Sequence, residues 1–159
     1  MIELGYSPGR ATLVQIRKVI YLALTTPPLQ YQVDANPVRT VPIENVVPTL
    51  QWHEQGKAPM PLVAYTVSAG TIRSRYLDLT PARARITVVS RHGADECMAI
   101  AFAIEARLAL ADQEGDPTRD LSNAAVQFAL IFPTEQMDPA YERETSRYYV
   151  TMRYTIIAH

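Results

Sequence analysis

Two adjoining stretches decide the fold: Ala84–Arg91 (ARITVVSR) and the alanine-rich segment from Asp95 to Asp112 (DECMAIAFAIEARLALAD). In the first, apolar and polar residues alternate, which predicts a half-buried strand. In the second, apolar residues recur every three or four positions, which predicts an amphipathic helix. Asp95 is a good capping residue for its start. The pair therefore predicts a strand followed by a helix that packs on a sheet.

Further periodic segments lie on both sides of this pair. An amphipathic helix is expected at Gly9–Leu24, capped by Ser7 and Pro8. The other strands are expected at Leu62–Ala69, Ile72–Leu79, Ala125–Phe132 and Thr145–Ala158. Together with Ala84–Arg91, the strands Leu62–Ala69 and Ile72–Leu79 are typical of an antiparallel meander. The acidic segment Pro133–Glu144 is expected to be a linker. This order predicts one α+β domain over residues 1–159, a mainly antiparallel sheet of about five strands with two helices packed on one face.

The segment Thr25–Pro61 holds seven of the twelve prolines. Proline this dense disfavours a regular helix or a central strand, so we expect a long proline-rich loop or arm. Two interpretations stay open. The segment lies across a neighbouring subunit, or it wraps around its own domain with Trp52 packed beneath it.

Composition narrows the class of protein. Apolar residues make up 48% of the 159, but no run approaches the roughly twenty needed to cross a bilayer. With no signal-peptide pattern at the start and a single cysteine, Cys97, we expect a soluble protein of a reducing compartment such as the cytoplasm. The net charge of −1 is not that of a dedicated nucleic-acid binder.

Arginine outnumbers lysine thirteen to two. Its planar guanidinium suits packed protein interfaces better than a hydrated ammonium does, although genomic base composition produces the same bias. Arg73, Arg75, Arg83 and Arg85 form the one cationic concentration. If they cluster, they would bind an acidic partner or a phosphate backbone, whereas the alternative is an ordinary solvated face.

We find no arrangement of residues typical of an active site. His53, His92 and His159 have no second metal ligand at helical or strand spacing. Ser90 and His92 resemble a nucleophile and base, yet they are better explained as a strand end. Cys97 lies on the apolar stripe of its helix, which indicates a buried small hydrophobe. Because no glycine-rich phosphate loop occurs either, we expect no enzyme activity, no metal and no cofactor.

The order of elements nevertheless resembles a known family. The stretches that carry the resemblance are the short first helix, the proline-containing excursion, Pro61–Tyr65 (PLVAY), Ile86–Ser90 (ITVVS), the alanine-rich helix, Asp138–Arg143 (DPAYER) and the strand Tyr148–Ile157. Together they resemble the tail terminator, or tail completion, proteins of tailed bacteriophages, although Thr25–Pro61 is longer than in the shorter members.

The resemblance implies a subunit of a hexameric ring without catalytic residues. That ring would cap the tail tube, end tube growth and join the tail to the head-side connector. Its partners would be copies of itself, the tube protein and the connector or neck proteins, with at most weak non-specific DNA contact in the lumen and no membrane. It would lie in the tail or neck of the virion after assembly in the host cytoplasm.

Aromatic and arginine side chains are enriched among interface hot spots. We therefore chose the candidate contact residues from these residue types. They are Trp52, Arg73, Arg75, Tyr76, Tyr141, Arg143 and Arg147. Three alternatives remain: another neck component such as a head-completion or connector protein, a small-ligand-binding regulatory α+β domain, and an enzyme with dispersed catalytic residues.

Overall fold

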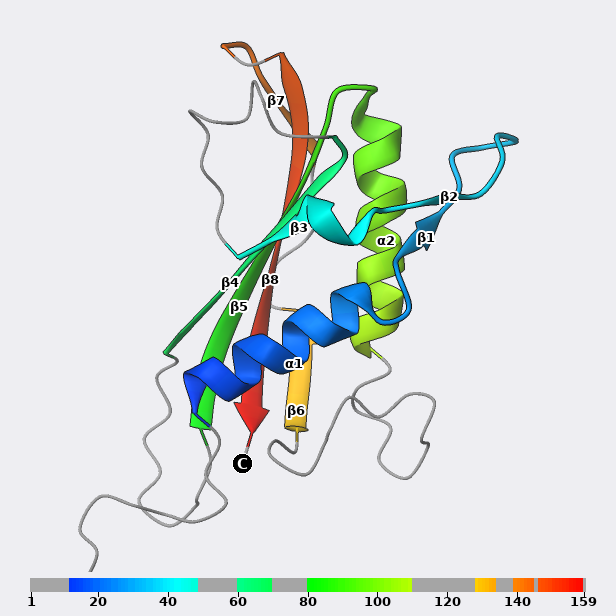
Figure 1. Ribbon diagram of the computed structural model, residues 1–159. Coiled ribbons are helices and arrows are strands. Elements are labelled where there is room, and N and C mark those ends of the chain that lie inside the picture. The colour runs from blue at the N-terminus through cyan, green and yellow to red at the C-terminus, as the bar shows by residue number, and fades with distance from the viewer. Residues whose placement is uncertain are drawn as a thin grey trace, which may run out of the picture.

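The computed structural model describes residues 12–48, 60–69, 80–109, 128–133, 139–144 and 146–158. Two helices lie on one face of a mostly antiparallel sheet, which confirms the predicted α+β fold (Figure 1). The elements are α1 (Leu13–Thr25), β1 (Gln30–Tyr31), β2 (Arg39–Thr40), a 3-10 turn (Ile43–Asn45), β3 (Val46–Val47), β4 (Leu62–Ala69), β5 (Thr80–Ser90), α2 (Ala94–Ala109), β6 (Phe128–Pro133), β7 (Pro139–Glu142) and β8 (Arg147–Ala158).

The centre of the sheet is the long antiparallel pair of β5 and β8, which runs from Thr80 opposite Ala158 to Ser90 opposite Tyr148. The strand order is β3-β4-β5-β8-β6, with β3 parallel to β4 and the other pairs antiparallel. Strand β7 pairs with the beginning of β8, along the edge where β6 pairs with its end. Two consecutive strands of the chain thus share one edge of β8.

The predicted meander of three consecutive strands is wrong in its pairing. Strand β4 is hydrogen-bonded directly to β5, from Leu62 opposite Val89 to Ala69 opposite Ala82. A strand at Ile72–Leu79 therefore cannot lie between them, and that stretch itself is outside the described residues. Strand β5 thus has β4 on one side and β8 on the other.

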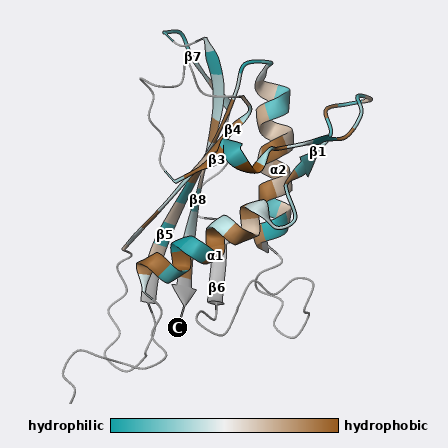
Figure 2. Ribbon diagram, in the orientation of Figure 1, coloured by the Kyte–Doolittle hydropathy of each residue, from teal (hydrophilic) through white to brown (hydrophobic). Residues whose placement is uncertain are grey.

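One apolar core fills the space between the sheet and the helices. Alternate residues of the central strands point into it, which is the expected consequence of period-two side chains. These are Ala82, Ala84, Ile86 and Val88 of β5, and Val150, Met152, Tyr154 and Ile156 of β8. The helices contribute Ile16, Val19, Ile20, Ala23, Leu24, Cys97, Ile100, Ala101, Ile104 and Leu108. Figure 2 shows apolar and polar residues alternating along α1, as expected for a helix that packs on a sheet.

Helix α1 begins later than predicted. It starts at Leu13, not Gly9, because Thr12 and Gln15 form a capping box. The Gln15 N–H donates to the Thr12 hydroxyl at 3.2 Å, and the Thr12 N–H donates to Gln15 Oε1 at 2.9 Å. These two bonds satisfy backbone donors that a helix end leaves without partners.

The described part of the proline-rich segment packs on its own domain. Strands β1 and β2 pair as a small antiparallel ribbon, and Leu29, Tyr31, Val41 and Val46 are buried in the core. The Asn45 side-chain amide also donates to the Pro61 carbonyl oxygen at 2.8 Å. Residues 49–59, Trp52 among them, lie outside the described residues.

Two further boundaries differ from the sequence analysis. The predicted linker Pro133–Glu144 contains the short strand β7, and β5 begins at Thr80, four residues before the predicted start. In the described ranges, neither helix is long and apolar enough to span a bilayer.

Candidate functional site

Three of the seven candidate contact residues lie where the structure describes them. Tyr141, Arg143 and Arg147 are all on or beside the β7–β8 hairpin. The other four, Trp52, Arg73, Arg75 and Tyr76, fall outside the described residues. The described part of the predicted contact surface therefore lies on the β7–β8 hairpin.

The β7–β8 hairpin extends past the start of α2 at one end of the sheet (Figure 1). Tyr141 lies opposite Tyr148 in the strand register, with the two ring centroids 4.9 Å apart. Tyr141 is nevertheless 52% exposed, and Arg143 is exposed in the turn. Cross-strand aromatic packing fixes the orientation of a side chain, so Tyr141 presents a largely pre-ordered ring to the surroundings.

Arg147 differs from its neighbours on the hairpin. It is 5% exposed, so its side chain is buried within its own subunit. A guanidinium in this position contributes to the fold of the hairpin and not to an accessible surface. The exposed candidates at this end of the molecule are thus Tyr141 and Arg143.

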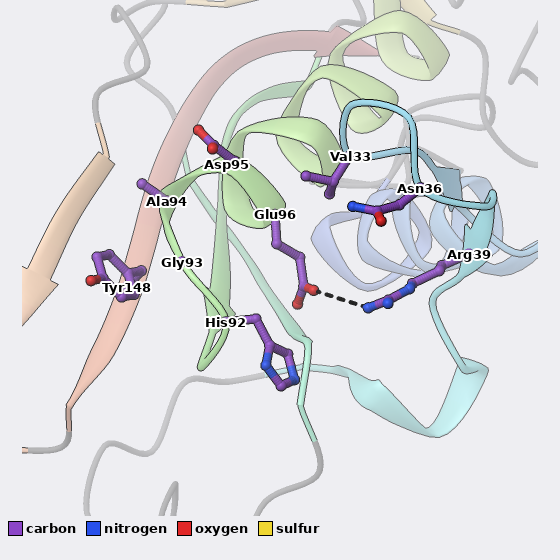
Figure 3. Close-up of a pocket in the computed structure, with 9 residues that line it drawn as sticks. All are labelled: Val33, Asn36, Arg39, His92, Gly93, Ala94, Asp95, Glu96 and Tyr148. Atoms are coloured by element: carbon purple, nitrogen blue, oxygen red, sulfur yellow. Dashed lines mark ion pairs between the residues drawn. The ribbon is translucent and has the colours of Figure 1, made fainter.

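A second feature is a hollow of about 520 Å³ beside the start of α2 (Figure 3). Its lining is Val33, Asn36, Arg39, His92, Gly93, Ala94, Asp95, Glu96 and Tyr148. Arg39 extends from β2 toward Glu96 on α2, and their closest nitrogen and oxygen atoms are 3.8 Å apart. This ion pair joins the β1–β2 ribbon to the first turn of the helix.

Behind this hollow, the side chains of Ser90 and Glu96 are hydrogen-bonded to each other. Glu96 is 4% exposed, and its Oε1 accepts a hydrogen bond from the Ser90 hydroxyl at 2.8 Å. The Ser90 oxygen in turn accepts the backbone N–H of His92 at 3.0 Å, so the imidazole is not its partner. A carboxylate in the first turn also interacts favourably with the helix dipole. The arrangement holds the end of β5 and the start of α2 together, as expected for a strand end.

Cys97 is a core residue here. It is fully buried, and its thiol lies 3.3 Å from the Tyr148 carbonyl oxygen, to which it donates. Burial raises the pKa of Cys97 to about 12, and the neighbouring Glu96 carboxylate acts in the same direction. A thiol with this pKa is protonated near neutral pH, which makes it a poor nucleophile.

Within the described ranges, no group of three or more histidine, cysteine, aspartate or glutamate side chains is placed to hold a metal ion. His92 is described and is exposed, whereas His53 and His159 are not described. Among the polar side chains that line the hollow beside α2, Arg39 and Glu96 are paired with each other.

The face of the sheet turned away from the helices carries a third feature. Arg83 and Arg85 of β5, two members of the predicted cationic concentration, are exposed there. Arg153 of β8 joins them, because it lies directly opposite Arg85 in the register. We call this surface the arginine face: Thr66, Ser68, Arg83, Arg85, Arg153 and Thr155, which line a hollow of about 670 Å³. Arg153 was missed by the sequence analysis, since only the register of β5 and β8 places it beside Arg85.

Comparison with known proteins adds no relative: no family model matches the chain, and no curated protein matches it significantly in sequence. Two exposed surfaces of the described residues therefore remain for interpretation. One is the β7–β8 hairpin with Tyr141 and Arg143, and the other is the arginine face.

Proposed function

We propose that the chain is a virion assembly protein of the tail terminator kind, whose copies form a ring that caps the tail tube of a bacteriophage. The observation that carries the proposal is the pair of exposed side chains, Tyr141 and Arg143, on a hairpin that extends past the start of α2. A half-exposed tyrosine held by stacking loses little conformational entropy on binding, and tyrosine and arginine are typical of interface hot spots.

The mechanism would be surface complementarity and symmetry. In a head-to-tail contact, one surface of each copy binds a different surface of the next copy. Such contacts close into a ring when the rotation that relates neighbouring copies is a whole fraction of a full turn. Such a ring has two different faces, one that matches the tube and one that matches the connector. Tube growth stops when the outer face lacks the tube's own docking elements.

The second candidate is a small-ligand-binding domain, because the hollow beside α2 falls in the size range of ligand pockets, about 300 to 1,000 Å³. Its buried carboxylate, however, is already bonded to Ser90 and paired with Arg39. A ligand that used Glu96 would have to displace both partners. On the hairpin, Tyr141 stays 52% exposed while its ring packs on Tyr148, so a partner can reach it without breaking that contact. This favours the assembly function over the binding pocket.

The proposal is tested by the native mass of the full chain, alone and mixed with the tube protein encoded in the same genome. We expect a ring, either alone or induced by tube protein, that is visible by negative-stain electron microscopy. Arg143→Glu and Tyr141→Ser should weaken the ring. Arg17→Glu, a matched charge reversal at an exposed position of α1, should leave it unchanged. A chain that stays monomeric or dimeric beside tube protein would contradict the function.

A further inference from the structure

A third exposed surface lies on the side of α2 that is turned away from the sheet. We call it the α2 outer face and define it by Met98, Ala99, Phe102 and Ala106, which the helical repeat places on one side of the helix. None of the four is fully buried, and Phe102 is 55% exposed. The α2 residues that fill the core lie on the other side of the helix: Cys97, Ile100, Ala101, Ile104 and Leu108.

The α2 outer face carries no charge, although a helix that packs on a sheet normally presents polar side chains to water. Only four residues of α2 are charged. Two of them serve the fold, since Glu96 is buried and Arg107 donates to a carbonyl oxygen of α1. The other two, Asp95 and Glu105, lie at the margins of the outer face. A helix that is apolar on both sides is typical of one covered on both sides, so the outer face is expected to have a partner.

The β7–β8 hairpin carries side chains that match this surface. Among the side chains that the structure describes, Tyr141 and Phe102 are the aromatic ones more than half exposed. Interface hot spots tend to pack against hot spots of the partner, and Tyr141 and Phe102 are of a suitable type. Arg143 on the hairpin is exposed, and Glu105 borders the outer face with the opposite charge.

The spacing of these residues also agrees. Tyr141 and Arg143 are two positions apart on the hairpin, which is roughly 7 Å in an extended chain. Phe102 and Glu105 are three positions apart on the helix, about 5 to 6 Å between their Cβ atoms. Arg143 therefore comes near Glu105 when Tyr141 packs on Phe102. The hairpin's Glu142 does not oppose this, because it follows Tyr141 on the strand and points to the other face, where it accepts the Glu144 N–H at 3.3 Å.

The two surfaces do not cover each other within one subunit. Both rings are more than half exposed. The hairpin extends past the start of α2, whereas Phe102 lies eight residues after Ala94, about 12 Å along the helix (Figure 1). We infer that the β7–β8 hairpin of one copy packs on the α2 outer face of the next copy, with Tyr141 on Phe102 and Arg143 beside Glu105. The inference rests on the proposed function, and it names the second surface that a head-to-tail contact needs.

The test mixes two variants of the full chain, each defective in one surface. Tyr141→Ser with Arg143→Glu disables the hairpin, and Phe102→Ser disables the outer face. Neither should form a ring under conditions in which the native chain does. An equal mixture still has one intact hairpin and one intact outer face, so native mass spectrometry should show heterodimers and no larger species. Leu22→Ser removes a comparably exposed apolar side chain from α1, 48% exposed, and should leave the ring intact.

A charge exchange in the same heterodimer tests the pairing of Arg143 with Glu105. Arg143→Glu in the copy that supplies the hairpin should weaken the heterodimer at least about tenfold, because it brings two acids together. Glu105→Arg in the copy that supplies the outer face should then recover most of the loss. In the native ring, benzoyl-phenylalanine in place of Phe102 keeps an aromatic ring at this position. On illumination it should cross-link to residues 139–144 of a neighbouring copy.

The outcomes separate this contact from the proposed function. A ring that persists in Phe102→Ser would overturn the inference and leave the function standing. Folded variants that form no heterodimer, or cross-links from position 102 to α1 or α2 of a neighbour, would also overturn the inference alone. Heterodimers from a chain that never forms a ring on tube protein would support the contact and contradict the function. A native chain that stays monomeric beside tube protein would contradict both.

Discussion

Arg107, in the last turn of α2, donates a hydrogen bond from Nη1 to the backbone carbonyl oxygen of Ala23 in the last turn of α1, at 3.0 Å. The same nitrogen also donates to the Pro27 carbonyl oxygen just beyond α1. The last carbonyls of a helix have no partners within it, and a cation there interacts favourably with the helix dipole. Burial lowers the pKa of Arg107, as expected for a partly desolvated guanidinium. One side chain thus joins the ends of both helices.

Replacing Arg107 should therefore destabilise the domain. We expect Arg107→Met to lower the free energy of unfolding by about 2 kcal/mol, because two carbonyl oxygens lose a charged donor while the apolar stem is kept. Arg107→Lys should recover part of this loss, since an ammonium cannot reproduce the guanidinium geometry. Arg17→Met, on the exposed side of α1, serves as the control and should change stability by less than about 0.5 kcal/mol. Equal effects of the two methionine variants in urea denaturation would contradict the role of Arg107.

The bond between Ser90 and Glu96 is expected to couple β5 to α2. Both side chains are buried, so removing one partner leaves the other without its hydrogen bond. Glu96→Leu and Ser90→Ala should each cost about 1 to 3 kcal/mol of unfolding free energy. The double variant should cost less than the sum, with a coupling of roughly 1 kcal/mol in a double-mutant cycle. Strict additivity would show that the two side chains do not act together.

The regular elements were predictable because their patterns are local. Alternation in Ala84–Arg91 and the three- and four-residue spacing of α2 follow from side-chain direction in strands and helices. The start of α1 was also present in the sequence, since Thr12 and Gln15 have the spacing of a capping box, but Ser7 and Pro8 offered a competing start. Strand β7 was missed because four residues that begin with Pro139 give too short a pattern.

The arginine face was not predictable, because it depends on pairing between distant segments. The sequence placed Arg85 and Arg153 on the polar sides of two strands, but it did not determine that those strands are neighbours. A shift of one residue in the register would move every side chain of a strand to the other face. The Arg39–Glu96 ion pair depends in the same way on where the β1–β2 ribbon packs. Contacts of this kind are set by tertiary packing.

Arg85 should lower the stability of the domain that carries it. It lies between Thr66 and Arg153, and the pair of like charges is unfavourable. We expect Arg85→Thr to raise the free energy of unfolding by roughly 0.5 kcal/mol at low salt, because it removes the repulsion and favours the strand. The gain should shrink at high salt, where exposed charges are screened. Destabilisation by this variant at every salt concentration would show that Arg85 stabilises the sheet.

Cys97 provides a prediction about pH. Burial raises the pKa of its thiol from 9.0 to about 12, so the folded chain holds the proton more tightly than the unfolded chain does. Its contribution to stability is therefore fully present below about pH 9 and is lost as the pH rises toward 12, by up to about 1.4 kcal/mol per pH unit. We expect Cys97→Ala to reduce the loss of stability between pH 8 and pH 10 by about 1 kcal/mol. Tyr154, whose pKa burial also raises, remains in both chains and cancels in the comparison. Equal pH dependence of the two chains, or fast labelling of native Cys97 by iodoacetamide at pH 8, would show that the thiol is accessible to solvent.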